Sequence, residues 1–383
     1  MPSEAYGRVD EVSTVWPDID DLYIDAPQWM GYKPKAPSGA IGREGGRVAA
    51  GTRDGSDFVV GLPKCELHVH LEGTLEADMA DLLAQRHGLP ALGAGRPADF
   101  DGLADFLSRY YAAMAGLRTE QDFYDLAAGY LDVARRQGVV YAEMFFDPQA
   151  HTARGVPFED VVRGLHRAQL DARSSGGPDS ALICCFLRDE PVESAAATLD
   201  ASLGFKDWIL GVGLDSDERG NPPAKFARVF ERARAAGYRL TMHCDPRQES
   251  SLDHLWQCLE VVGVDRIDHG VECLADDRLV AELARRRLGL TVCPLSNLRL
   301  YGDLMADAVS EMLRRDVLVT VNSDDPAYFG GYVADNYRAV ADDAHLDRAA
   351  LVRLARNSFE ASWLSPERRG GYLRQVDDYA AGA

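Results

Sequence analysis

Short apolar runs recur along this chain from residue 59 onward, and they alternate with amphipathic segments of helical periodicity. From the second run onward they follow one another roughly every 25–40 residues, which is the spacing of one strand–helix unit. Several are rich in Val, Ile, Leu and Cys with little polar alternation, as expected of strands buried on both faces. The eight expected strands are 59–70, 139–146, 181–187, 209–214, 239–243, 266–269, 288–293 and 317–322. This pattern predicts an α/β fold, a (β/α)8 TIM barrel.

Two segments fall outside the repeating pattern. Residues 1–58 are rich in Gly, Pro and Asp and lack sustained periodicity, so we interpret them as an irregular N-terminal arm. Its scattered aromatic residues, such as Trp16 and Trp29, favour docking onto the domain or onto a partner subunit and are compatible with a homodimer. The long gap after the first run predicts a helical insertion that includes 75–87 and 121–137. Residues 59–383 then form the barrel domain.

The charge balance restricts the kinds of partner. The 383 residues include 61 acidic and 41 basic ones, for a net charge of −20. Such a surface repels phosphate backbones and anionic lipid head groups, so we expect no nucleic-acid partner and no membrane partner. The first residues lack the basic patch and apolar stretch of a secretory signal, and no apolar run approaches the length of a membrane span. The seven cysteines form no CxxC pair, which favours buried free thiols in a reducing cytoplasm.

Polar residues of similar chemistry gather at the C-terminal ends of the predicted strands. His68 and His70 end the first run, His243 ends the fifth, and Asp324 follows the last. In a (β/α)8 barrel these ends meet at one mouth, where active sites are built. His68 and His70 are two residues apart, so both side chains point to the same face. Three imidazoles and a carboxylate suit a catalytic divalent metal with an open position for water. Buried hydrogen bonds to carboxylates are the alternative explanation for the histidines.

Two further residues at these ends suggest roles in the chemistry. His269 ends the sixth run, and we favour a role in orienting a metal-bound water over those of a fourth ligand or a core histidine. Asp325 points away from Asp324, so we expect one carboxylate to ligate the metal and the other to accept a hydrogen bond from a substrate N–H. A turn before Pro326 is the plainer explanation of the two acids.

The ordered motifs resemble the adenosine/adenine deaminase family of the amidohydrolase superfamily, over roughly residues 59–365. The stretch PKCELHVHLEGT at 63–74 is similar to the family's first-strand motif, and VNSDDP at 321–326 is similar to its last. The resemblance is closest to the adenine deaminases, which act on the free base. The stretches FFDPQAHT at 145–152, GLDS at 213–216, NPP at 221–223 and DDPAYFGGY at 324–332 look like that group. Glu72 also favours the adenine deaminases, because nucleoside deaminases tend to have Asp at this position, where it binds the sugar.

The resemblance implies a barrel with one divalent metal ion per chain, usually zinc. Its ligands would be His68, His70, His243 and Asp324. The metal would supply hydroxide near neutral pH, His269 would hold it, and the hydroxide would add to the carbon that bears the amino group. Asp325 would accept a hydrogen bond from a ring N–H, and the loop around Ser216 would touch the purine edge.

One position departs from the family pattern. The family has His-Ala-Gly-Glu after the fifth strand, and that Glu protonates the ring nitrogen beside the attacked carbon. This chain has His243-Cys244-Asp245-Pro246, and Pro246 cannot donate a proton. Loss of a general acid typically costs on the order of 10²–10⁴ in rate. Asp245 or Glu249 could take over if the loop turns one of them inward, and a place on a surface loop is an equally weighted alternative for both.

The sequence therefore predicts a zinc-dependent hydrolytic deaminase of an adenine-like or modified aminopurine base that releases ammonia. The candidate catalytic residues are His269, Asp325 and Glu249, and the candidate substrate-binding residues are Glu72, Ser216 and Asp325. Two alternatives stay open: a metal-dependent hydrolase of another heterocycle or cyclic amide, and a non-catalytic small-molecule binder. The complete set of metal ligands weighs against the binder, since a binding module has no need to keep it.

Overall fold

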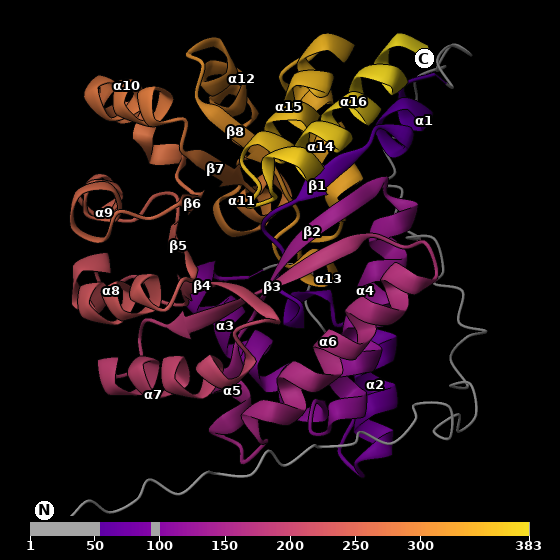
Figure 1. The fold of residues 1–383 in the computed structure, drawn as a ribbon, viewed down its shortest axis with the longest axis vertical. Coiled ribbons are helices and arrows are strands. Elements are labelled where there is room, and N and C mark those ends of the chain that lie inside the picture. Colours follow the sequence, from indigo (N-terminus) through magenta and orange to yellow (C-terminus); the bar gives the residue numbers. More distant parts are fainter. Residues whose placement is uncertain (1–53, 93–99, 383) are drawn as a thin grey trace, which may run out of the picture. The chain divides into compact units, whose positions relative to one another are not determined.

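The computed structural model describes residues 54–92 and 100–382. Within them eight parallel strands pair in sequence order, and helices surround them (Figure 1). The strands are β1 (Lys64–Glu66), β2 (Val139–Phe146), β3 (Asp179–Leu187), β4 (Ile209–Asp215), β5 (Arg239–Cys244), β6 (Arg266–His269), β7 (Gly289–Val292) and β8 (Leu318–Val321). This order confirms the predicted (β/α)8 TIM barrel.

Seven of the eight expected strands agree with the structure to within two residues at each end. The first one differs, because helix α1 (Asp54–Gly61) occupies the start of the apolar run 59–70. A short apolar run does not by itself distinguish a strand from a buried helical turn. The predicted boundary at residue 58 therefore lies inside α1, and the rest of the predicted arm, residues 1–53, lies outside the described residues.

The helices follow the strands in alternation, apart from an insertion between β1 and β2 that was expected from the sequence. The insertion contains α2 (Ala77–Arg86), α3 (Gly102–Ala113) and α4 (Glu120–Arg136). The others are α5 (Pro148–Thr152), α6 (Phe158–Ser174), α7 (Val192–Ser202), α8 (Ala227–Ala235), α9 (Ser251–Gln257), α10 (Asp277–Arg286), α11 (Pro294–Tyr301), α12 (Ala306–Arg314), α13 (Pro326–Phe329), α14 (Val333–Asp343), α15 (Arg348–Glu360) and α16 (Pro366–Gly382). Among the described residues, no helix is both long and apolar enough to cross a bilayer.

The strands are buried on both faces, as their composition predicts. In β2, Met144 and Phe146 belong to the large core, whereas Phe145 packs with Ile183 and Cys185 in a separate small cluster. This small cluster lies beneath the barrel mouth, since the Phe145 ring centre is 5.0 Å from that of His68. The barrel thus has an apolar floor under the residues that we predict to bind the metal.

The first and last strands meet at the predicted metal ligands. A single parallel bridge pairs Val69 with Asp324, beyond the ends of β1 and β8. The His70 N–H donates to the Asp324 carbonyl at 3.0 Å, and the Asp324 N–H donates to the His68 carbonyl at 3.0 Å. The contact that links the two ends of the sheet therefore also fixes the backbone of three predicted ligands.

Candidate active site

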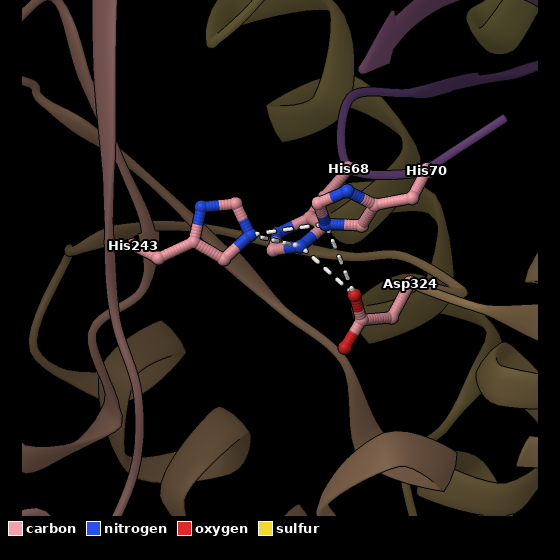
Figure 2. A group of neighbouring side chains, drawn as sticks. All are labelled: His68, His70, His243 and Asp324. Carbon is pink, nitrogen blue, oxygen red and sulfur yellow. Dashed lines mark hydrogen bonds and ion pairs between the residues drawn. The ribbon is translucent and has the colours of Figure 1, made fainter. Parts of the chain in front are cut away.

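Three imidazole rings and one carboxylate point toward a common spot at the barrel mouth (Figure 2). His243 Nε2 lies 3.1 Å from the Nε2 atoms of both His68 and His70. Asp324 Oδ1 lies 3.2 Å from His68 Nε2 and 3.5 Å from His70 Nε2. Ligands placed about 2.1 Å from a zinc ion in a tetrahedron are ~3.4 Å apart. The four predicted ligands therefore form a metal-binding cluster with the spacing that such an ion needs.

The outer nitrogens of two rings have partners that fix their orientation. His68 Nδ1 lies 2.8 Å from Oγ1 of Thr291, which itself donates to Asp268 at 3.0 Å. His243 Nδ1 lies 3.1 Å from the carbonyl oxygen of Leu214, so this nitrogen carries the proton. Each ring then presents an unprotonated Nε2 to the cluster, as in metal-binding histidines. Lone pairs that face one another at this distance repel unless a cation lies between them, which favours the metal over simple core histidines.

Burial sets the protonation of the cluster. It lowers the pKa of His68 to about 4, although the Asp324 carboxylate opposes this. Burial and the neighbouring histidines hold the pKa of His243 well below its usual range. Burial alone would raise the pKa of Asp324, but His68 and the other nearby histidines keep it well below normal. Neutral imidazoles and an ionised carboxylate are the forms that bind a metal.

His269 lies beside the cluster. Its Nε2 is 3.9 Å from Asp324 Oδ2 and 3.2 Å from Asp245 Oδ1. The backbone of His269 has a φ of 58°, in the left-handed region that disfavours non-glycine residues, and Ser216 and Asp324 share this feature at 72° and 65°. Strained backbone of this kind is held in place by its surroundings and clusters at functional sites. The position fits the predicted role of His269 next to the attacking water.

The loop after β5 brings one of the two candidate acids to the site. Asp245 is buried and lines the cavity together with Pro246. Its backbone N–H donates to the buried Glu218. Burial raises the pKa of Asp245 to about 7, although His269 opposes this. Glu249 is exposed and is not among the residues that line the cavity, so of these two candidate acids only Asp245 lies at the site.

Two of the three predicted substrate contacts lie at the cavity. Asp325 lines it, its Oδ1 is buried without a hydrogen-bond partner, and burial together with Asp324 raises its pKa well above normal. Ser216 also lines it and accepts a hydrogen bond from the Tyr111 hydroxyl at 3.1 Å. Glu72 is not among the lining residues. Its Oε1 instead lies 2.8 Å from His151 Nε2, behind the cavity wall.

The structure also places residues at the cavity that we did not predict from sequence. Asp147 and Asp215 line it from the ends of β2 and β4. Helix α3 contributes one wall, with Leu103, Phe106, Leu107, Tyr110 and Tyr111. A signal for Asp147 was available, because Asp147-Pro148 repeats at a strand end the Asp-Pro pair of Asp325-Pro326. No comparable signal marked α3, since an amphipathic helix in the insertion does not show which element it covers.

Comparisons with known proteins agree with this geometry. The sequence pattern of the adenosine deaminase family matches residues 63–379. An adenine deaminase of Trichlorobacter lovleyi is 46% identical over 326 residues, covering 83% of this chain and 93% of that protein. An adenine deaminase of Sphingopyxis alaskensis is 49% identical over 330 residues, covering 84% of this chain and 96% of that protein.

Solved structures give the same picture. The crystal structure of an adenine deaminase from Arthrobacter aurescens matches with a TM-score of 0.80 and 41% identity, covering 84% of this chain and 99% of that one. An amidohydrolase from Burkholderia ambifaria, crystallised with bound zinc, matches with a TM-score of 0.78 and 25% identity, covering 87% of this chain and 96% of that one.

Proposed function

Because this chain belongs to the adenosine deaminase family and is a hydrolytic deaminase of the adenine deaminase type, we propose that its substrate is a free adenine-like base and its cofactor one zinc ion. The observation that carries this proposal is the convergence of three buried histidines and one buried carboxylate at the barrel mouth. The same donor set favours zinc, which prefers imidazole nitrogen and carboxylate oxygen in a four-coordinate site.

The metal would be held by His68, His70, His243 and Asp324. A divalent ion held there would lower the pKa of water enough to supply hydroxide near neutral pH. The apolar floor of Phe145, Ile183 and Cys185 keeps this end of the site dry, which strengthens each electrostatic contact in it.

Side chains of the protein bind the attacking water, transfer the proton and bind the base. His269 faces the cluster and holds the attacking water by a hydrogen bond. Asp245 lies 3.2 Å from His269 and lines the cavity, so we assign it the proton that the ring nitrogen beside the attacked carbon must receive. Asp325 hydrogen-bonds to a ring nitrogen, and Ser216 contacts the edge of the purine. Pro246 offers only an apolar surface where the family's acid is expected.

Ammonia release from a panel of aminopurines, measured alongside the metal content of the purified protein, tests this function. We expect adenine or a close derivative to release ammonia and about one zinc ion to copurify with each chain. His243→Ala should lose both the metal and the activity, because it removes a ligand at the centre of the cluster.

Three results would count against the proposal. Full activity in a metal-free His243→Ala protein would contradict it directly. Hydrolysis of a cyclic amide, with no ammonia from any aminopurine, would favour the alternative heterocycle hydrolase. Stoichiometric binding of a purine without turnover would favour the non-catalytic binder.

A further inference from the structure

Two buried carboxyl groups in the cavity have no part in the reaction described above. Asp147 directly follows β2 and is 1% exposed, and Asp215 ends β4 and is 3% exposed. One oxygen of each lies within 4.8 Å of the other and of a His70 nitrogen. Oδ1 of Asp147 and Oδ1 of Asp215 have no hydrogen-bond partner among the described residues, and Oδ2 of Asp215 faces His70 Nδ1 at 3.6 Å. Buried polar atoms are nearly always satisfied, so these oxygens point to a ligand that is bound during function.

The Asp147 carboxyl does not bind the N-terminal N–H groups of helix α5, which are its nearest possible partners along the chain. Asp147 precedes α5, the position where an aspartate commonly caps the first N–H groups of a helix, yet its side chain makes no capping hydrogen bond. Its backbone N–H instead donates to Glu72 Oε1 at 3.0 Å, and the same oxygen lies 2.8 Å from His151 Nε2. Glu72 thus anchors the backbone of Asp147 and leaves its carboxyl free to line the cavity.

The same arrangement recurs at a residue already assigned to substrate binding. Asp325 precedes α13, also stands before a proline, also makes no capping hydrogen bond, and also lines the cavity with a buried unpartnered Oδ1. Two strand ends therefore present an uncapped aspartate to one cavity, and the physical argument for a substrate contact applies to both.

Asp147 and Asp215 lie on the His70 side of the metal cluster, where one oxygen of each is within 4.8 Å of a His70 nitrogen. Asp215, its neighbour, is 3.6 Å from Nδ1 of His70, the nitrogen on the far side of the ring from the metal cluster. The proton-transfer pair of His269 and Asp245 lies at the cluster itself. In an aminopurine, the ring nitrogen that carries the sugar of a nucleoside is at the end of the bicycle opposite the amino group. If the amino-bearing carbon lies at the cluster beside the His269–Asp245 pair, that nitrogen is directed toward the side of the cavity that Asp147 and Asp215 line.

On the basis of the proposed function, we propose that Asp147 is the residue that selects a free base, by accepting a hydrogen bond from the unsubstituted ring nitrogen. A base with a substituent on that nitrogen has no N–H to donate and leaves the buried carboxyl unpaired. Sites built to hydrogen-bond a substrate group reject analogues without it strongly, because the buried partner is then unsatisfied. Glu72, which the family resemblance linked to a free-base substrate, then acts indirectly, by holding the backbone of Asp147.

Equilibrium binding of two products to the zinc-loaded enzyme tests this role. Hypoxanthine and 9-methylhypoxanthine lack the amino leaving group, so their dissociation constants can be measured by calorimetry without turnover. We expect the wild-type enzyme to bind hypoxanthine about 100-fold more tightly or more. Asp147→Ala should reduce that ratio to below about 10-fold, because it removes the acceptor and opens space for the methyl group.

Two variants serve as controls, and the metal content of each is measured. Asp147→Asn keeps the size of the side chain and one acceptor oxygen, so it should retain most of the discrimination. Asp189→Asn changes an exposed carboxylate that follows β3 at the same end of the barrel, and both dissociation constants should stay unchanged.

An unchanged ratio in Asp147→Ala, or a wild-type enzyme that binds the two products equally or not at all, would overturn the role of Asp147. Ammonia assays with adenine and 9-methyladenine separate this result from a failure of the proposed function. Selective binding without ammonia release refutes the deaminase reaction and supports Asp147, whereas equal turnover of both bases supports the reaction and refutes Asp147.

Discussion

The loop after β5 places a proline and an aspartate side by side on the cavity wall. Pro246 stands at the position of the expected acid and has no proton to give, whereas Asp245 is buried there and lies 3.2 Å from His269. In the proposed reaction the acid is therefore displaced by one residue along the chain. Burial and the neighbouring Glu218 raise the pKa of the Asp245 carboxyl against the effect of His269, so it is well suited to hold a proton until the ring nitrogen requires it.

Asp245→Asn tests this displacement. We expect kcat with adenine to fall by about 10²–10⁴, the usual cost of losing a general acid. The amide keeps the size of the side chain and an oxygen facing His269, so the metal content and the fold should stay unchanged. Glu249→Gln is the matched comparison: an equal loss there, with an active Asp245→Asn enzyme, would return the role to Glu249.

Among the elements, the short 3-10 helix η3 (Glu72–Thr74) packs directly against the end of β8. A Cβ atom built on Gly73 would lie 2.7 Å from the Cα of Asp325 and would also overlap its side chain. This close approach requires glycine. It also explains how the ends of the first and last strands can bring Asp325 and the metal ligands within reach of one substrate.

Gly73→Ala should therefore displace Asp325. We expect kcat/KM to fall by about 10²-fold, since a shift of roughly 1 Å in a positioning residue costs that much. Gly204→Ala is the control, because a Cβ there meets no atom within 4 Å and the residue has no left-handed backbone. Wild-type activity in Gly73→Ala would show that the substrate does not depend on the placement of Asp325.

At the scale of the whole molecule, the metal cluster joins distant parts of the chain. Its ligands come from the ends of β1, β5 and β8, and β8 meets β1 through the isolated bridge at Val69 and Asp324. A bound ion therefore adds a link at the point where the barrel closes. Because ligand binding to the folded state alone raises stability, the metal should stabilise the closed barrel.

Removal of the metal by a chelator should lower the melting temperature by about 3–4 °C, from ~2.7 kcal/mol of binding energy at a hundredfold excess over the dissociation constant and an unfolding entropy of ~2.1 cal/mol/K per residue. Differential scanning calorimetry with and without chelator measures this shift. His70→Ala, which lacks a ligand, should show little further change on chelation. Identical melting curves for the wild-type protein in both conditions would refute a structural contribution from the ion.

Much of the fold and of the metal site could be predicted because it depends on local patterns. Apolar runs buried on both faces gave strands such as β2 and β6 with the observed bounds. The same patterns failed at residues 59–61, where an apolar run belongs to α1. Glu249 and Glu72, chosen as site residues from the sequence, lie on the surface and behind the cavity wall respectively.

The sequence by itself determined the barrel and the metal-ligand residues at its mouth. The spacing of the strands places their C-terminal ends together, and the two-residue spacing of His68 and His70 puts both side chains on one face. Only the tertiary structure decided which carboxyls face the cavity. That choice depends on backbone turns after the strands, such as the left-handed Ser216 and Arg247, and on contacts between segments far apart in sequence. The sequence does not give the backbone dihedral angles of these turns or the residues that contact them. Asp147 and Asp245 could therefore be recognised as cavity residues only in the folded protein.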